Sequence, residues 1–174
     1  MNNKINKKFL TKKELDNWAR YYSTLKEKQE NEENQWLIFT LGNEKFSILI
    51  DYLDEISTIQ NGVGIKNCKA NIIGLMNLRG ETVVIADLGK LIGIRNTPEP
   101  EPEQRILVIS DQNGCKTGFL VDNVKCFAYI NESDISKYIS DEASSSQFIK
   151  YIAKFKEELV ACIDVPAILN ETWN

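Results

Sequence analysis

Residues 72–92 read IIGLMNLRGETVVIADLGKLI, and this stretch carries the pattern that decides the fold. Two apolar runs rich in β-branched residues, 72–75 and 82–86, predict strands. Arg79 stands before Gly80 at the corner where the first run gives way to a turn, and glycine admits turn conformations closed to other residues. After the second run, Asp87 opens a short helical turn.

The same pattern returns 77 residues further along the chain. Ile72, Leu75, Leu78, Arg79, Glu81 and Val83 fall on Ile149, Ile152, Phe155, Lys156, Glu158 and Val160. The same shift places Asp87-Leu88 on Asp164-Val165 and Leu91-Ile92 on Ile168-Leu169, and a shift of 71 places Ile50-Asp51-x-Leu53 on Val121-Asp122-x-Val124. The repeat predicts two similar small antiparallel β-barrels packed together.

Further short apolar runs with β-branched and aromatic residues predict the remaining strands. They lie at residues 36–41, 44–50, 105–109, 117–121, 124–130 and 159–163. Residues 97–103 read TPEPEPE, a stiff acidic connector whose prolines cannot join a sheet. We therefore expect a mainly β fold, with residues 35–170 as one two-lobed domain.

Residues 1–34 predict a separate helical extension. Thr11 and Glu14 form a capping box, and the helix is expected to continue to about residue 31. Its apolar stripe consists of Leu15, Trp18, Tyr22 and Leu25. Two interpretations remain open: the stripe packs on the protein's own barrels, or Trp18, Tyr22 and Leu25 form an additional interaction face. Lysine and glutamate mix on the polar side, which gives little support to a membrane helix.

Composition argues against several classes of function. The 174-residue chain contains no histidine, which removes Ser-His and Cys-His catalysis and histidine-ligated zinc. The four cysteines are Cys68, Cys115, Cys126 and Cys162, and they lack C-x-x-C spacing, so we expect free thiols. No metal ion or cofactor is therefore expected, and catalysis becomes a less favoured function, although enzymes can work with carboxylates and lysine alone.

The charge balance argues against nucleic acid as a partner. The net charge is −4, and residues 35–174 carry 13 basic and 19 acidic side chains, a net of −6. No run approaches 18 apolar residues, and no apolar segment follows the N-terminal lysines. Neither a membrane span nor a secretory signal is expected.

Four segments together resemble the CheW family, over about residues 36–169. The most specific is Asn77-Leu78-Arg79-Gly80, preceded by Ile73-Gly74 and followed by a strand ending in Asp87-Leu88. The others are Phe39-Thr40-Leu41-Gly42 with Phe46 and Ile48, then Leu53-Asp54-Glu55-Ile56, and Gly118-Phe119-Leu120-Val121-Asp122-x-Val124. The sequence departs from the family pattern at Lys69, Gly89 and Tyr151, which bears on partner choice more than on fold.

The resemblance implies two SH3-like five-stranded barrels on a shared hydrophobic seam and a non-catalytic adaptor function. Its implied partners are the regulatory domain of the histidine kinase CheA, the cytoplasmic tip of a methyl-accepting chemoreceptor, and other CheW-like domains in a ring. It implies a cytoplasmic protein recruited to membrane-associated receptor arrays. Carried over by position, the partner-binding residues are Arg79, Leu53, Glu55, Ile106, Gly118 and Val124.

Each of these residues also has an ordinary structural interpretation. Arg79 could form an ion pair with Asp87 or Glu81, and core packing is the simplest account of Leu53 and Val124. Two alternative functions also remain. One is a CheW-like paralogue serving a different kinase or receptor class, and the other is a small β-barrel enzyme or OB-like nucleic-acid-binding module.

Overall fold

The computed structural model describes residues 34–59, 62–65, 67–94, 101–111, 113–138 and 146–173. The predicted N-terminal helix, with Trp18, Tyr22 and Leu25, lies outside these ranges. Residues 34–174 form one compact unit. No helix in the described part of the chain is long and apolar enough to cross a membrane.

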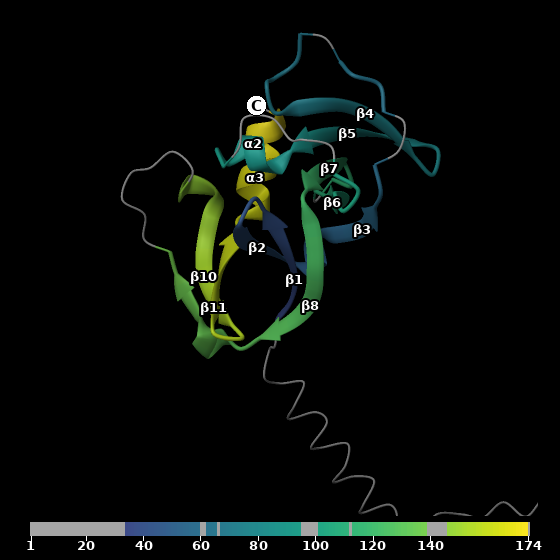
Figure 1. The fold of residues 1–174 in the computed structure, drawn as a ribbon. Coiled ribbons are helices and arrows are strands. Elements are labelled where there is room, and N and C mark those ends of the chain that lie inside the picture. The colour runs from purple at the N-terminus through teal and green to yellow at the C-terminus, as the bar shows by residue number, and fades with distance from the viewer. Residues whose placement is uncertain are drawn as a thin grey trace, which may run out of the picture. The chain divides into compact units, whose positions relative to one another are not determined.

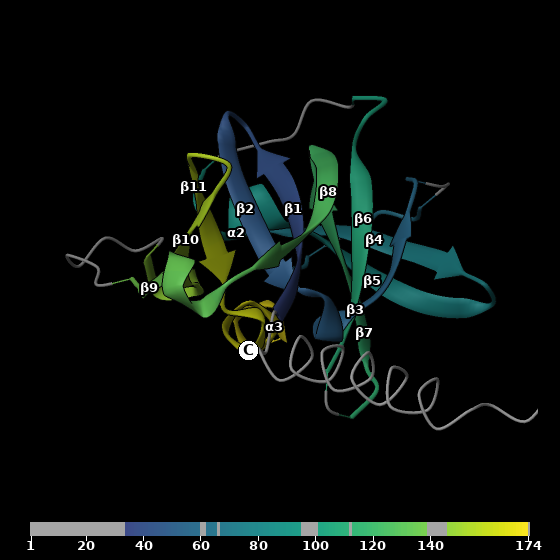
Figure 2. The ribbon, with the colours of Figure 1, turned by 90° about the horizontal axis from the view of Figure 1, so that it is seen from below.

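The chain folds into two β-sheets, each curled into its own lobe (Figures 1 and 2). The first has the order β8-β1-β2-β11-β10-β9, with β1 (Asn34–Leu41), β2 (Glu44–Leu49), β8 (Asn123–Ile130), β9 (Ile135–Lys137), β10 (Ile149–Phe155) and β11 (Glu158–Ile163). The second has the order β3-β6-β7-β5-β4, with β3 (Leu53–Ser57), β4 (Ile72–Leu78), β5 (Glu81–Asp87), β6 (Arg105–Ser110) and β7 (Lys116–Val121). The prediction of a mainly β, two-lobed fold is confirmed.

Short helical segments connect or follow the strands. Two are α-helices, α2 (Leu88–Leu91) and α3 (Val165–Trp173). Three are 3-10 turns, η1 (Ile50–Tyr52), η2 (Glu132–Asp134) and η3 (Ser146–Phe148). Both α-helices begin after an aspartate of the repeat: Asp87 accepts a hydrogen bond from the Lys90 amide at 3.1 Å, and Asp164 accepts one from the Ala167 amide at 3.2 Å. These contacts satisfy amide groups that a helix N-terminus leaves unpaired.

Each lobe has an interior core, and a third core joins the lobes. Strand β1 shows why, because five of its eight residues are buried and they lie on both faces of the strand. Trp36 and Ile38 point into the first lobe, whereas Leu37 and Phe39 point into the shared core. The shared core also takes Phe119 from the second sheet and side chains from α3, which lies between the lobes in Figure 2. A strand with apolar residues on both faces therefore marks the place where the two lobes share a core.

The repeat is structural, but its halves exchange strands. Strands β1 and β2 of the first half join β8–β11 of the second, while β6 and β7 of the second half join β3–β5 of the first. Each sheet therefore contains one parallel pair, where the sequence predicted antiparallel barrels. Ala161 pairs with Phe46 in the first sheet, and Val84 pairs with Thr117 in the second. The shift of 77 residues places Val84 on Ala161, and the shift of 71 residues places Phe46 on Thr117. The two parallel pairs therefore occupy equivalent positions in the repeat.

Three strands were not predicted from the sequence: β3, β9 and β10. The first sheet therefore has six strands where the resemblance implied five-stranded barrels, and the sixth, β9, has only three residues. Each of the predicted strands is present, with ends that differ by up to three residues.

The hairpin turns of the two halves differ in a way that predicts a stability change. Arg79 and Gly80 connect β4 to β5 with φ of 51° and 91°, and Lys156 and Glu157 connect β10 to β11 with φ of 49° and 65°. Positive φ at both central residues defines a type I′ turn, in which glycine is favoured at the second position. Glu157→Gly is therefore expected to raise the free energy of unfolding by about 1 kcal/mol.

Thermal melting of Glu157→Gly beside Glu157→Gln checks this expectation. The glutamine variant also loses the exposed Lys154–Glu157 ion pair, at 2.8 Å, but keeps the side-chain carbon that strains the turn. A glycine variant that melts no higher than the glutamine variant would contradict the turn assignment.

Candidate functional site

Arg79 is presented to solvent by the turn that the Asn77-Leu78-Arg79-Gly80 motif forms. The side chain of Asn77 accepts a hydrogen bond from the Gly80 amide at 3.0 Å, which fixes the turn. Gly80 adopts a φ of 91° that other residues rarely adopt. As a result, the side chain of Arg79 stands 84% exposed at the tip of the β4–β5 hairpin.

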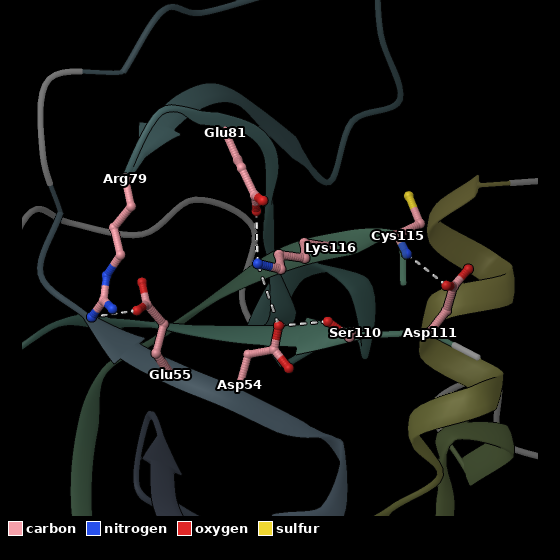
Figure 3. Close-up of polar contacts among 8 residues, drawn as sticks. All are labelled: Asp54, Glu55, Arg79, Glu81, Ser110, Asp111, Cys115 and Lys116. Atoms are coloured by element: carbon pink, nitrogen blue, oxygen red, sulfur yellow. Dashed lines mark hydrogen bonds and ion pairs between the residues drawn. The ribbon is translucent and has the colours of Figure 1, made fainter. Parts of the chain in front are cut away.

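The guanidinium of Arg79 forms an ion pair with Glu55, not with the Asp87 or Glu81 suggested by sequence. The Arg79 Nη2 atom lies 2.8 Å from Oε2 of Glu55, whose side chain is only 21% exposed. Glu55 belongs to β3, the edge strand opposite β4 in the second sheet. The ion pair therefore connects β3, at one edge of the second sheet, to the turn that follows β4, at the other edge (Figure 3).

A second cation, Lys116 at the start of β7, lies beside this pair (Figure 3). Its Nζ atom is 2.6 Å from Oε2 of Glu81 and 3.8 Å from Oδ2 of Asp54. The hydroxyl of Ser110 donates a hydrogen bond to the same Asp54 oxygen at 2.6 Å. The hydrogen bond to Glu81 is the main reason that the pKa of Lys116 is raised above its ordinary value.

These charged residues line a groove of about 320 Å³ on the second lobe. Its lining residues are Asp54, Glu55, Leu78, Arg79, Glu81, Val108 and Lys116. Three carboxylates and two cations give it a formal charge of −1. We call this feature the Arg79 groove. It offers ionic contacts around two apolar side chains, an arrangement suited to binding another protein chain.

The other residues assigned by resemblance are not brought into the Arg79 groove. Leu53 and Val124 are partly buried and pack against the shared core. Ile106 is 1% exposed within the second lobe. Gly118 lies between Ile85 and Ile106, where an added Cβ would come within 2.5 Å of the first and 2.7 Å of the second. Ile106 shares a core cluster with Leu78 and Val108, the apolar residues that line the groove, whereas Leu53 and Val124 belong to the core between the lobes.

Sequence reasoning missed residues that the structure places at the surface. Lys116, Asp54 and Ser110 belong to the Arg79 groove or support it, although Asp54 was part of a quoted motif. On β8, Phe127 and Tyr129 are 53% and 61% exposed. Their alternation with the buried Ala128 and Ile130 was the available signal, since it predicts one solvent-facing row of aromatic residues.

No group of three or more potential metal-ligating side chains comes together anywhere in the described ranges.

Comparison with known proteins finds one consistent family. A "Probable chemotaxis protein CheW" of Rhizobium etli is 25% identical over 143 residues, covering 80% of this chain and 90% of the relative. The "Chemotaxis protein CheW" of Bacillus subtilis is 25% identical over 138 residues, covering 78% and 86%.

A solved structure has the same fold. The crystal structure of scaffolding protein TtCheW from Thermoanaerobacter tengcongensis matches with a TM-score of 0.68 and 24% identity, over 76% of this chain and 85% of that one. The profile of the CheW-like domain matches residues 35–172, nearly the whole described part of the chain. The chain therefore belongs to the family of CheW-like domains.

Proposed function

We propose that this protein is a non-catalytic adaptor that links the cytoplasmic tips of chemoreceptors to the regulatory domain of a CheA-type histidine kinase. The observation that carries the proposal is the Arg79 groove. In it the exposed Arg79 of the Asn77-Leu78-Arg79-Gly80 motif forms an ion pair with Glu55, the other charged residue that the family resemblance assigns to partner binding. In this proposal the protein works in the cytoplasm and is recruited to receptor arrays at the membrane.

The chemistry of Arg79 suits a contact with a partner protein. A guanidinium has five N–H donors in a planar fork, and the ion pair with Glu55 engages Nη2 on one side of it. Because the side chain is 84% exposed, the remaining donors are available to a partner. Arginine residues of this kind are frequent among the few side chains that dominate binding energy.

Replacing Arg79 by alanine is expected to weaken partner binding by about 2 kcal/mol, roughly 30-fold in affinity, with little change in melting temperature. The loss should follow removal of partner contacts, since the Arg79–Glu55 pair itself is largely solvent-exposed on the arginine side. Affinities for a purified kinase regulatory domain and for a receptor tip fragment are measured separately, together with receptor-dependent kinase activity.

The matched control is Lys156→Ala. Lys156 occupies the equivalent position in the equivalent turn of the other lobe, with nearly the same φ. It should keep its partner affinities within about threefold, as most surface contacts do. If Arg79→Ala binds as wild type, or if it melts far below wild type, the role of Arg79 in partner recognition is rejected.

The same measurements address the alternative of a paralogue. If the wild-type chain binds a receptor tip but no CheA regulatory domain, the result would favour a paralogue that works with a different kinase. Leu53, Ile106, Gly118 and Val124 remain in the proposal as residues that shape the partner-facing surfaces from within.

Ring assembly with other CheW-like domains is also part of the proposal. Two exposed apolar surfaces, one on each lobe, support it. Val63, 71% exposed, borders an apolar groove of about 200 Å³ between the β3–β4 loop and β4. Leu159, also 71% exposed, stands on β11 of the other lobe. Isolated apolar side chains on a surface are ordinary, but a groove with apolar walls favours a binding role.

For residues 1–34 we propose an extension distinct from the CheW-like domain at 35–170. The independent compactness of residues 34–174 supports this division. Trp18, Tyr22 and Leu25 are proposed as an additional interaction face of the extension, on the basis of the helical spacing of the apolar stripe.

A further inference from the structure

Four neighbouring strands of the second sheet contribute one side chain each to a continuous line of polar contacts. In sheet order these are Asp54 on β3, Ser110 on β6, Lys116 on β7 and Glu81 on β5. Lys116 is the centre of the line, because its ammonium contacts the carboxylates on both sides. Ser110 is its direct cross-strand partner and orients Asp54.

The line of contacts adjoins the Arg79–Glu55 pair at both of its ends. Asp54 precedes Glu55 in β3, and Glu81 follows Arg79 and Gly80 in the hairpin. Figure 3 shows the guanidinium of Arg79 directed at Glu55, and the ammonium of Lys116 directed at Glu81 and Asp54. Lys116 contacts Asp54 and Glu81, and Arg79 pairs with the third carboxylate of the groove, Glu55.

Removing the charge of Lys116 would change this distribution. The formal charge of the groove would fall from −1 to −2, and Asp54 and Glu81 would lose their cation. An arginine near several unpaired carboxylates is drawn toward them, since opposite charges attract strongly at short range and surface screening acts mainly beyond about 10 Å.

We propose that Lys116 is a positioning residue that keeps Arg79 in a single ion pair with Glu55, so that its guanidinium stays available for a carboxylate of the partner. The kind of side chain that the partner presents depends on which of the two cations, Arg79 or Lys116, has N–H donors beyond those that the groove's carboxylates engage. The ammonium of Lys116 is held between two carboxylates, whereas the 84% exposed side chain of Arg79 has one ion-pair partner within the groove. An acidic side chain on the partner therefore meets Arg79.

This inference rests on the proposed role of Arg79, and the experiment separates the two. Four variants are compared with wild type: Arg79→Ala, Lys116→Met, Lys116→Arg and the double variant Lys116→Met/Glu81→Gln. Methionine keeps the apolar stem without the charge, and the double variant also removes the carboxylate that Lys116 neutralises. The probes are a receptor cytoplasmic-tip fragment and a CheA regulatory domain, each titrated calorimetrically.

The expected result is a loss of about tenfold in affinity for Lys116→Met, for at least one probe, without a matching fall in melting temperature. Lys116→Arg keeps the charge and should bind within about threefold of wild type. The double variant should recover part of the loss, because it removes one of the two carboxylates that Lys116→Met leaves without a cation and returns the formal charge of the groove to −1. A merely structural lysine would change melting temperature and affinity together, so recovery of affinity at an unchanged melting temperature is the result that identifies a positioning role.

A second readout follows Arg79 itself. The Nε–Hε signal of Arg79 in ¹⁵N NMR spectra should shift in Lys116→Met and return toward its wild-type position in the double variant. An unmoved Arg79 signal, or a double variant that binds no better than Lys116→Met, overturns the inference. If Arg79→Ala weakens binding and Lys116→Met does not, this inference alone fails. If Arg79→Ala binds as wild type, the proposed role of Arg79 fails with it.

Discussion

Replacing Phe39 by alanine is expected to lower the free energy of unfolding by about 3–5 kcal/mol. Phe39 is fully buried in the shared core and stacks on Phe46, with ring centroids 6.2 Å apart. Its removal opens a cavity where both lobes meet. Because small domains have only about 5–15 kcal/mol of net stability, this single change removes a large fraction of it.

The control is Phe127→Ala, the same chemical change at a side chain 53% exposed on β8. Phe127→Ala should lower the free energy of unfolding by no more than about 1 kcal/mol, because little apolar contact is lost. Urea unfolding followed by far- and near-ultraviolet circular dichroism measures both variants. Since the core is shared, Phe39→Ala should still unfold in one transition, and two separated transitions would show that the lobes are stabilised independently.

Replacing Gly118 by alanine should cost about 3 kcal/mol, the upper end of what overpacking usually costs. The added Cβ would lie 2.5 Å from Cδ1 of Ile85 and 2.7 Å from Cγ2 of Ile106, both closer than carbon atoms tolerate. The strand must shift to relieve these contacts, and Lys116, two residues earlier on β7, would shift with it. Loss of partner binding in such a variant would then follow from displaced packing.

A double variant separates packing from direct recognition. Ile85→Val deletes the Cδ1 atom that the new Cβ would meet, and alone it should destabilise by about 1 kcal/mol. In the Gly118→Ala background it should instead raise the melting temperature. Gly64→Ala serves as the neutral comparison, since its nearest neighbour to a new Cβ is 4.0 Å away. If Ile85→Val destabilises both backgrounds equally, steric crowding is not the reason for glycine at this position.

Strands with both faces buried were the most predictable parts of the fold. Strands β1, β6 and β7 read as continuous apolar runs, and their predicted ends lie within two residues of the observed ones. Strand β10 was missed because it reads IKYIAKF, with Ile149, Ile152 and Phe155 spaced three apart as on a helix. Only its pairing with β11 and β9 overrides that spacing. Strand β3 was missed because Asp54 and Glu55 interrupt it.

Pairings between distant segments left no local signal in the sequence. The parallel contact of Phe46 with Ala161 joins segments more than a hundred residues apart, and no turn or loop length indicates it. The same limit applies to the site. Arg79 and Glu55 were each assigned through the family resemblance, but their ion pair depends on how the second sheet closes on itself. Lys116 belonged to no motif, so only the folded sheet reveals its neighbours.

The exchange of strands between the halves means that neither lobe exists as a continuous piece of chain. As the chain is synthesised, β1 and β2 must wait for β8 and β11, and β3 must wait for β6. Such long-range pairing delays folding and leaves strand edges open in the meantime. A fragment truncated after β5 would contain parts of both lobes and the whole of neither. Premature termination after β5 would thus leave no separately complete lobe.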